Sequence, residues 1–288
     1  MLKQRIITAL ILLPIALCGF FLLTGAYFAL FIGFVVVLGA WEWARLAGFA
    51  AQSMRIGYAA VVAVLLFLMY LLPGLEPWVL VAAVIWWAVA TFLVLTYPDS
   101  SEHWASAACK LVIGLLILLP AWQGLVLIKQ WPLGNWLILA VMVLVWAADI
   151  GAYFSGKAFG KRKLAPKVSP GKSWEGVYGG LAVSLGITAA VGISRDWTVT
   201  QFIGGLLGAA VVVFISVIRD LTESMFKRQS GVKDSSNLLP GHGGVLDRID
   251  SLTAAIPVFA VLLWAADWGV MWVVCNRSLF WVRPAPSG

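Results

Sequence analysis

Nine long apolar runs occupy most of this 288-residue chain, and they limit its possible folds more than any other feature. A transmembrane helix needs roughly 20 consecutive apolar residues to cross a hydrocarbon core of ~30 Å. The runs lie at about 6–23, 26–40, 56–72, 78–95, 111–128, 136–154, 174–193, 199–218 and 252–274. With 62% hydrophobic residues and a mean hydropathy of +0.96, the sequence predicts an all-α polytopic integral membrane protein.

The sequence indicates a single membrane domain over residues 1–288, because no repeat or low-complexity linker divides it. Residues 1–130 are expected to form N-terminal helices, for which a scaffold, a dimer and a lipid-facing role stay open. Residues 131–275 contain the polar segments and are expected to carry catalysis. The apolar run after Arg5 extends almost uncharged to Trp41, which is too long for the core of a signal peptide. We interpret its start as the first span.

Basic residues are distributed unevenly between the two sides that nine spans define. The side with the N-terminus and the even-numbered loops carries 16 of the 20 Lys and Arg residues. The other side carries Lys129, Arg195, Arg277 and Arg283. Loops rich in Lys and Arg stay in the cytoplasm, so the N-terminus and both polar segments are expected there. This placement accounts for the net charge of +7 without a nucleic-acid partner.

The stretch 219–251 is the most polar part of the chain. It holds five acids, five bases and His242, although only 11% of all residues are charged. If the helix continues beyond span 199–218, three polar side chains share one of its faces. These are Asp220, Glu223 and Ser224. Asp247 and Asp250 are expected to begin the last span, and the glycines beside His242 let the backbone approach a ligand closely.

These acids favour a magnesium site for a polyphosphate substrate. Magnesium is typically held by one or two carboxylates together with substrate phosphates. The expected metal ligands are Asp220, Glu223, Asp247 and Asp250. Bases of the same stretch would neutralise the remaining phosphate charge: Lys227, Arg228, Lys233 and Arg248. Helix capping and surface ion pairs are the competing interpretation, but they explain poorly why so many charges gather at one membrane border.

A second basic segment precedes span 174–193. Its Gly171-Lys172-Ser173 looks like the end of a phosphate-binding P-loop, but Pro166 replaces the first glycine. No strand is expected before it either, so the sequence argues against a P-loop fold.

Phosphate binding at this segment does not require that fold. Ser173 is expected at the start of span 174–193, where exposed backbone amides favour anions. We therefore expect Lys172 and Ser173 to bind phosphate. For Lys161 to Lys163, phosphate binding and contact with lipid headgroups stay equal alternatives.

Two further features lie inside the predicted spans. Asp149 is an ionisable residue about one turn from the cytoplasmic end of span 136–154, which makes it a functional candidate or a solvated cap. Two pairs of glycines have the small-xxx-small spacing that lets membrane helices approach closely. We expect these glycines to serve helix packing and to have no role in catalysis or binding. The pairs are Gly176/Gly180 and Gly204/Gly208.

The motif over 224–250 resembles the signature of phosphatidate cytidylyltransferases (CDP-diacylglycerol synthases). Its fixed positions read Ser224-x-x-Lys227-Arg228-x4-Lys233-Asp234-x4-Leu239-Pro240-Gly241-His242-Gly243-Gly244-x2-Asp247-Arg248-x-Asp250. Segments 149–153 and 167–176 resemble the same family, so the similarity covers roughly 146–251. Before residue 146 only the hydropathy matches.

This resemblance implies transfer of a cytidylyl group from CTP to phosphatidic acid, giving CDP-diacylglycerol and pyrophosphate. It also implies that Asp220 and Asp247 hold magnesium, with a monovalent cation such as K⁺ as an optional second metal. A homodimer in the bacterial inner membrane is implied as well. The expected catalytic residues are Asp220, Asp247 and Lys227. The expected substrate-binding residues are Asp149, Lys167, Ser169, Lys172, Ser173, Ser224, Arg228, Lys233, His242, Gly243, Gly244 and Arg248.

Two other classes of protein compete with this interpretation. A CTP-dependent polyprenol kinase would release CDP instead of pyrophosphate. A transporter would use intramembrane charges in broken helices near the midplane, whereas the charges here lie at one membrane border.

Overall fold

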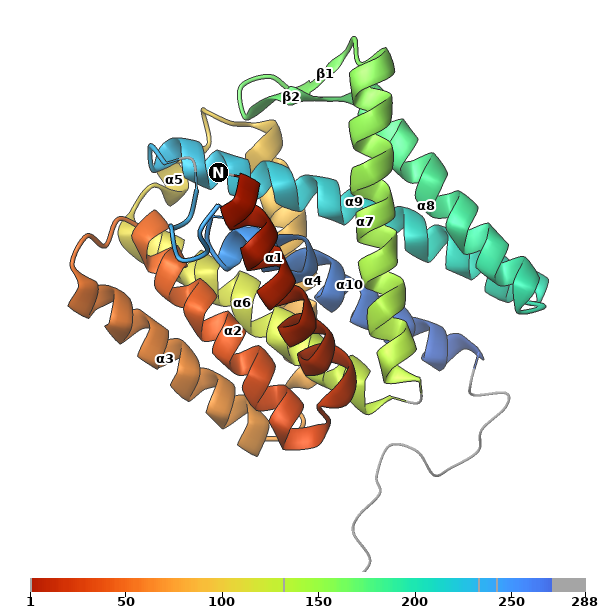
Figure 1. Ribbon diagram of the computed structural model, residues 1–288, viewed down its shortest axis with the longest axis horizontal. Coiled ribbons are helices and arrows are strands. Elements are labelled where there is room, and N and C mark those ends of the chain that lie inside the picture. Colours follow the sequence, from red (N-terminus) through yellow and green to blue (C-terminus); the bar gives the residue numbers. More distant parts are fainter. Residues whose placement is uncertain (1, 132, 233, 242, 271–288) are drawn as a thin grey trace, which may run out of the picture.

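The computed structural model describes residues 2–131, 133–232, 234–241 and 243–270, and helices dominate it (Figure 1). The helices are α1 (Leu2–Leu17), the short π-helix η1 (Cys18–Leu22), α2 (Gly25–Leu46), α3 (Gln52–Leu71), α4 (Glu76–Leu95), α5 (Ser101–Trp104), α6 (Ala107–Gln130), α7 (Gly134–Phe159), α8 (Trp174–Ser194), α9 (Val199–Gln229) and α10 (Leu246–Val270). Two strands, β1 (Lys163–Ala165) and β2 (Ser169–Ser173), form a hairpin between α7 and α8.

The predicted all-α membrane fold is confirmed. Among the described residues, eight helices are long and apolar enough to cross a membrane, namely α2, α3, α4, α6, α7, α8, α9 and α10. The first predicted span coincides with α1 and η1, whose apolar part, Ile6–Leu22, is shorter. Each of the nine predicted runs therefore has a helix in its place, the last of them as far as residue 270, where the described residues end. The main difference is α9, which continues past the predicted end at 218 to Gln229.

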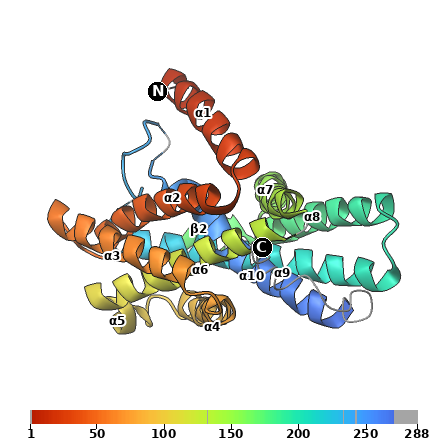
Figure 2. The same ribbon diagram turned by 90° about the horizontal axis from the view of Figure 1, so that it is seen from below.

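The core lies where α10 packs against α4, α6 and α9, and α2 packs against both α6 and α10. Of the eight long helices, α6 is buried over the largest share of its length. Helices α7 and α8 pack closely where the hairpin joins them and diverge toward the C-terminal end of α8 (Figure 1). Figure 2 shows α1 standing away from the other helices, with η1 joining it to α2. Its Thr8 hydroxyl still donates a hydrogen bond to the Pro240 carbonyl at 2.9 Å.

Close packing of α7 on α8 depends on glycine. A Cβ atom added at Gly180 would lie 2.6 Å from the Ala148 carbonyl oxygen, and one at Gly176 would lie 3.0 Å from that of Ala152. The prediction for this first pair is thus confirmed. The structure shows no such close approach at the second pair. A Cβ at Gly204 would meet no described atom within 4 Å, and one at Gly208 would lie 4.0 Å from Leu262 Cδ1, an ordinary contact.

We expect Gly180→Ala to lower the thermal unfolding temperature of the detergent-solubilised protein. The added methyl group would strike backbone, which cannot move aside as a flexible side chain can, so the expected loss is about 1–3 kcal/mol. Gly204→Ala is the matched control: it adds the same atom on a helix where there is open space, and alanine favours a helix over glycine by about 1 kcal/mol. Equal unfolding temperatures for the two variants would contradict the packing argument.

The hairpin between α7 and α8 corrects one expectation. Strand β1 precedes the Gly171-Lys172-Ser173 segment, and these three residues are the end of β2. Lys163 lies opposite Ser173 in the antiparallel pair. The strands are short and β2 contains proline and glycine, which are depleted in strands, so propensity gave no sign of them. The argument against a P-loop still holds, because Lys172 lies within a strand rather than in a glycine-rich loop before a helix.

Candidate active site

One buried arginine joins the acids of α9 and α10. The guanidinium of Arg219 lies 3.3 Å from a carboxylate oxygen of Asp220, 3.0 Å from one of Glu223 and 2.6 Å from one of Asp250. Only 4% of the Arg219 side chain is exposed. Five donors on a rigid, planar group allow one arginine to serve several carboxylates at once. The predicted continuation of α9 is therefore confirmed, and its acids face the first turns of α10.

Two lysines complete this ion-pair network. The Lys227 ammonium lies 2.9 Å from oxygens of both Glu223 and Asp247, so it forms a second bridge between α9 and α10. Lys172, from strand β2, lies 2.5 Å from an oxygen of Asp220. The hairpin and the two helices thus converge on one cluster of charges. Together with Arg219, these lysines give three bases for four carboxylates.

The loop that joins α9 to α10, residues 230–245, is what we call the signature loop. Its irregular backbone over 238–244 was predicted, and the described part of it confirms this. Gly243 has φ +79°, a left-handed conformation that glycine adopts without a steric cost. The backbone amides of Gly244 and Ser235 donate to Asp247 at 2.8 and 3.2 Å, which fixes that carboxylate at the start of α10.

The start of α8 is built as predicted. The Ser173 hydroxyl accepts a hydrogen bond from the Gly176 amide at 3.2 Å, so Ser173 caps the helix beside Lys172. Glu175, in the first turn, accepts from the amide of Lys161 at 3.1 Å. The carboxylate thereby closes the basic segment back onto the helix, which is the kind of contact that orients a loop rather than a substrate.

Several predicted substrate-binding residues lie outside the network. Arg228 donates from Nε to the Val168 carbonyl, so it holds the hairpin against α9. Asp149 is exposed on α7, near enough to interact electrostatically with Asp220 and Lys172. In the described part of the chain, no hydrogen bond or ion pair joins three further predicted residues to the network. These are Lys167, Ser169 and Ser224.

Of the three remaining predicted residues, the structure describes only Arg248. Arg248 is exposed in the first turn of α10 and has interactions of its own. Lys233 and His242 lie outside the described residues, so their expected roles stay predictions.

The carboxylates could hold magnesium together with substrate phosphates, but not as a site made of the described protein side chains alone. Among the described residues, no three His, Cys, Asp or Glu side chains gather closely enough to hold a metal ion by themselves. Magnesium rarely needs such a cage, since one or two carboxylates and substrate phosphates suffice. The four carboxylates outnumber the three bases of the network, although each carboxylate pairs with at least one of these bases. The Oε1 atom of Glu223 is buried, and the Lys227 ammonium 2.9 Å away is its ion-pair partner among the described residues.

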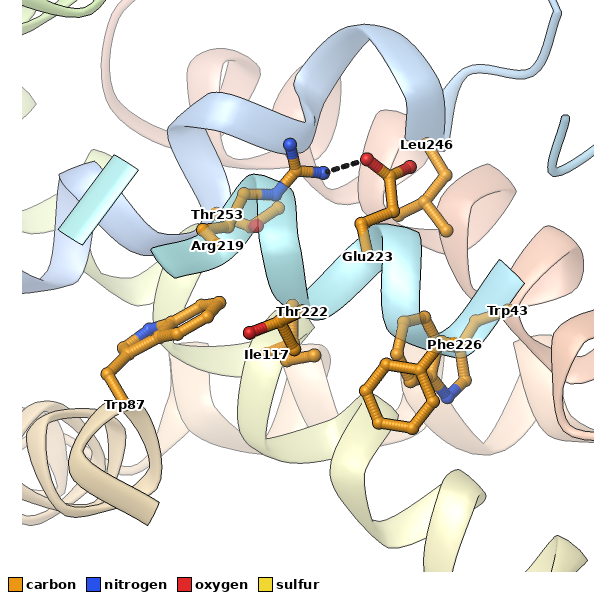
Figure 3. A pocket seen from close by; sticks show the side chains of 9 residues that line it. All are labelled: Trp43, Trp87, Ile117, Arg219, Thr222, Glu223, Phe226, Leu246 and Thr253. Carbon is orange, nitrogen blue, oxygen red and sulfur yellow. Dashed lines mark hydrogen bonds and ion pairs between the residues drawn. The ribbon is translucent and has the colours of Figure 1, made fainter. Parts of the chain in front are cut away.

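A small cavity lies beneath the network. It has a volume of about 20 Å³, enough for a water molecule but not for a nucleotide. Figure 3 shows Arg219 and Glu223 on one side of this cavity and aromatic rings on the other. The Phe226 ring packs edge-on against Trp43, with ring centroids 5.1 Å apart. The charges therefore have an apolar floor, and a substrate must approach them from the opposite side.

Two residues of this site were not assigned a role from the sequence. Arg219 was counted among the five bases of the stretch 219–251, but no role was given to it. Glu42 of α2 is fully buried and accepts hydrogen bonds from the signature loop. An ionisable residue at the edge of a membrane span is a signal for function, and in Glu42 that signal was present in the sequence.

The fold and the charged site define a multi-pass membrane protein whose polar site lies where α9, α10 and the hairpin meet. Residues 3–266 match the cytidylyltransferase family. The chain is 74% identical to a phosphatidate cytidylyltransferase of Pseudomonas aeruginosa over 269 residues, which is 93% of this chain and 99% of the relative. It is 47% identical to a phosphatidate cytidylyltransferase of Haemophilus influenzae, covering 90% of this chain and 98% of that one. The chain belongs to the cytidylyltransferase family.

Proposed function

We propose that this protein transfers the cytidylyl group of CTP to phosphatidic acid and so makes CDP-diacylglycerol and pyrophosphate. One observation carries the proposal. A member of the cytidylyltransferase family, 74% identical to a phosphatidate cytidylyltransferase, brings Asp220, Asp247 and three bases together at one site.

The reaction needs neutralisation of charge more than it needs a base. An oxygen of the lipid phosphate attacks the α-phosphorus of CTP, and the bond to the β-phosphate breaks to release pyrophosphate. The lipid phosphate is already an anion near neutral pH, so little proton transfer is required. Two polyanions must instead be brought into line. Lys172, Lys227 and Arg219 provide the positive charge that this approach requires.

One or two of the carboxylates Asp220, Glu223, Asp247 and Asp250 would hold magnesium together with the substrate phosphates, with K⁺ as an optional second cation. When bound, magnesium stabilises negative charge on the phosphates and orients them. Lys172 and Lys227, which pair with these carboxylates in the structure, could then pair with the phosphates instead. The carboxylates would be neutralised by magnesium and the phosphates by the lysines. Lys172 is best placed for this exchange, because its side chain and that of Asp220 are both about 30% exposed.

Lys172→Ala is expected to lower kcat/KM for CTP by about 10- to 100-fold, because a charge-assisted contact with phosphate is lost. Steady-state kinetics at saturating phosphatidic acid would measure this effect. Lys157→Ala is the matched control, since that lysine lies in the last turn of α7 and forms no ion pair among the described residues. A Lys172→Ala enzyme as efficient as the control would remove Lys172 from the site.

A groove beside the signature loop is suited to the acyl chains of the lipid. It has a volume of about 480 Å³ and lies between α1 and the loop. Its lining is mostly apolar and includes Ile7, Ile11, Leu239 and Pro240. The Leu239 amide donates to the Gly243 carbonyl at 2.8 Å. Leu239, which lines the groove, is therefore hydrogen-bonded to the residue before Gly244, whose amide donates to Asp247. A chain lying here would place its headgroup near the network.

The protein is proposed to lie in the inner membrane of a bacterium as a homodimer, with its N-terminus and the signature loop in the cytoplasm. The distribution of Lys and Arg supports this orientation, and the bacterial relatives support the membrane. CTP is a cytoplasmic nucleotide, which requires the site to open on that side.

The activity can be tested with purified protein, phosphatidic acid, magnesium and CTP labelled on its α-phosphate. The expected result is label in the lipid and release of pyrophosphate. Release of CDP with label-free lipid would identify a kinase instead. Flux through proteoliposomes without any chemical change would identify a transporter.

A further inference from the structure

A carboxylate from the N-terminal part of the chain reaches the signature loop. Glu42 lies in α2, and its side chain is fully buried. The proposed chemistry does not use it. We propose that Glu42 is a positioning residue, which holds the end of the signature loop and, through it, Asp247 in the geometry that cytidylyl transfer needs. This inference rests on the proposed function.

Four hydrogen bonds converge on Glu42, two on each of its carboxylate oxygens. Oε1 accepts from the Ser236 hydroxyl at 2.5 Å and from the Val245 amide at 3.0 Å. Oε2 accepts from the Ser235 hydroxyl at 3.2 Å and from the Leu246 amide at 2.6 Å. A buried carboxylate is costly unless hydrogen bonds replace its lost water. Here all four partners come from a single segment of twelve residues, 235–246.

The position of Glu42 also matches the electrostatics of α10. Leu246 is the first residue of this helix, and the first amides of a helix lack partners within it. A negative charge at such a helix N-terminus is stabilised by the aligned peptide dipoles. Glu42 therefore caps α10 from a different helix. Arg55 lies near enough to interact electrostatically with Glu42, but the signature loop and the helix end donate the four hydrogen bonds described above.

The contacts of Glu42 and of Asp247 share the same loop residues. Ser235 donates its hydroxyl to Glu42 and its amide to Asp247. Gly244 donates its amide to Asp247, and a Cβ added at Gly244 would lie 2.6 Å from Glu42 Oε1. The loop is thus clamped between two carboxylates. Displacing it from Glu42 would move the amides that orient Asp247.

The end of α2 makes two further contacts with this region. The Ser230 hydroxyl donates to the Leu46 carbonyl at 2.6 Å, and Arg45 donates to the Ser235 carbonyl at 3.4 Å. Both ends of the signature loop therefore rest on the last turns of α2. This gives the N-terminal part of the chain a role at the site, although it contributes none of the charges that we place on substrate.

Glu42→Gln tests the proposal, because it keeps the shape of the side chain. One oxygen becomes an NH₂ group that faces an amide donor, Val245 or Leu246, and a backbone amide cannot reverse its hydrogen bond. The expected loss in kcat is about 10- to 100-fold, as for residues that orient metal ligands, with a rise in the magnesium concentration needed for half-maximal activity. Faster hydrogen–deuterium exchange over 235–246 is expected in the absence of substrate and metal.

Two further variants separate positioning from general destabilisation. Ser184→Ala removes a buried hydrogen bond between α8 and α7, and it should change neither the exchange over 235–246 nor the response to magnesium. Ser236→Ala removes one of the four bonds of Glu42 and should show the same changes as Glu42→Gln, but smaller. If Glu42→Gln does not fold, Ser236→Ala carries the test.

Two outcomes would overturn the proposal. One is a folded Glu42→Gln with the kcat and magnesium response of the unmodified protein. The other is unchanged exchange over 235–246 in both variants. A failure of the proposed function is distinct from these results, because it would leave the unmodified protein unable to label the lipid while the exchange measurement still reports the contact.

Discussion

Asp247→Asn is expected to abolish cytidylyl transfer while the protein stays folded. Asparagine can keep an oxygen where the amides of Gly244 and Ser235 donate, so the contacts of residue 247 with the signature loop are retained. Its NH₂ group then faces the Lys227 ammonium, which lies 2.9 Å from the other carboxylate oxygen. The change removes one charge from the proposed magnesium site and repels Lys227. We expect kcat to fall by at least about 100-fold.

Transfer of the α-phosphate label from CTP into phosphatidic acid measures this loss directly. The unfolding temperature must stay close to that of the unmodified protein, which shows that the fold survives. Asp99→Asn provides the control, since it makes the same chemical change at an acid outside the network. Full turnover by a folded Asp247→Asn enzyme would rule out the assignment of Asp247 as a metal ligand.

The helices were predictable because one physical requirement dominates them. A backbone inside a membrane must satisfy its own hydrogen bonds, so each apolar run of sufficient length had to become a helix. The β1–β2 hairpin was not predictable in this way. It lies outside the apolar runs. It depends on contacts between residues far apart in the sequence, such as that between Arg228 and the Val168 carbonyl. No local pattern in the sequence predicts such a contact.

The site was predictable as a set of residues but not as a set of partners. Helical spacing placed Asp220 and Glu223 together. Ion pairs were the competing interpretation of these charges, and the structure contains one between Glu223 and Lys227. That one lysine would also bridge to Asp247 depends on how α9 crosses α10. Glu42 was missed for a related reason, since it lies about 190 residues before its partners. Periodicity relates neighbours in a helix and says nothing about such distances.

Arg219→Ala is expected to produce the largest loss of stability. Its buried guanidinium serves Asp220, Glu223 and Asp250, so the variant leaves three carboxylates without their shared cation. Removing one partner of a buried ion pair typically costs about 3–5 kcal/mol. Because Asp220 and Asp250 are partly exposed, at 30% and 22%, solvent offsets some of this cost, and we expect about 3 kcal/mol. Chemical unfolding in detergent would measure it.

Two comparisons identify the cause of this loss. Arg219→Lys keeps the charge but lacks the planar fork that reaches several carboxylates, so it should recover only part of the stability. Magnesium should raise the unfolding temperature of Arg219→Ala more than that of the unmodified protein, because a divalent cation can replace the missing charge between the acids. Arg195→Ala, at an exposed C-cap of α8, should show neither effect. Stabilisation by magnesium that is equal in all variants would mean that the carboxylates around Arg219 do not bind the ion.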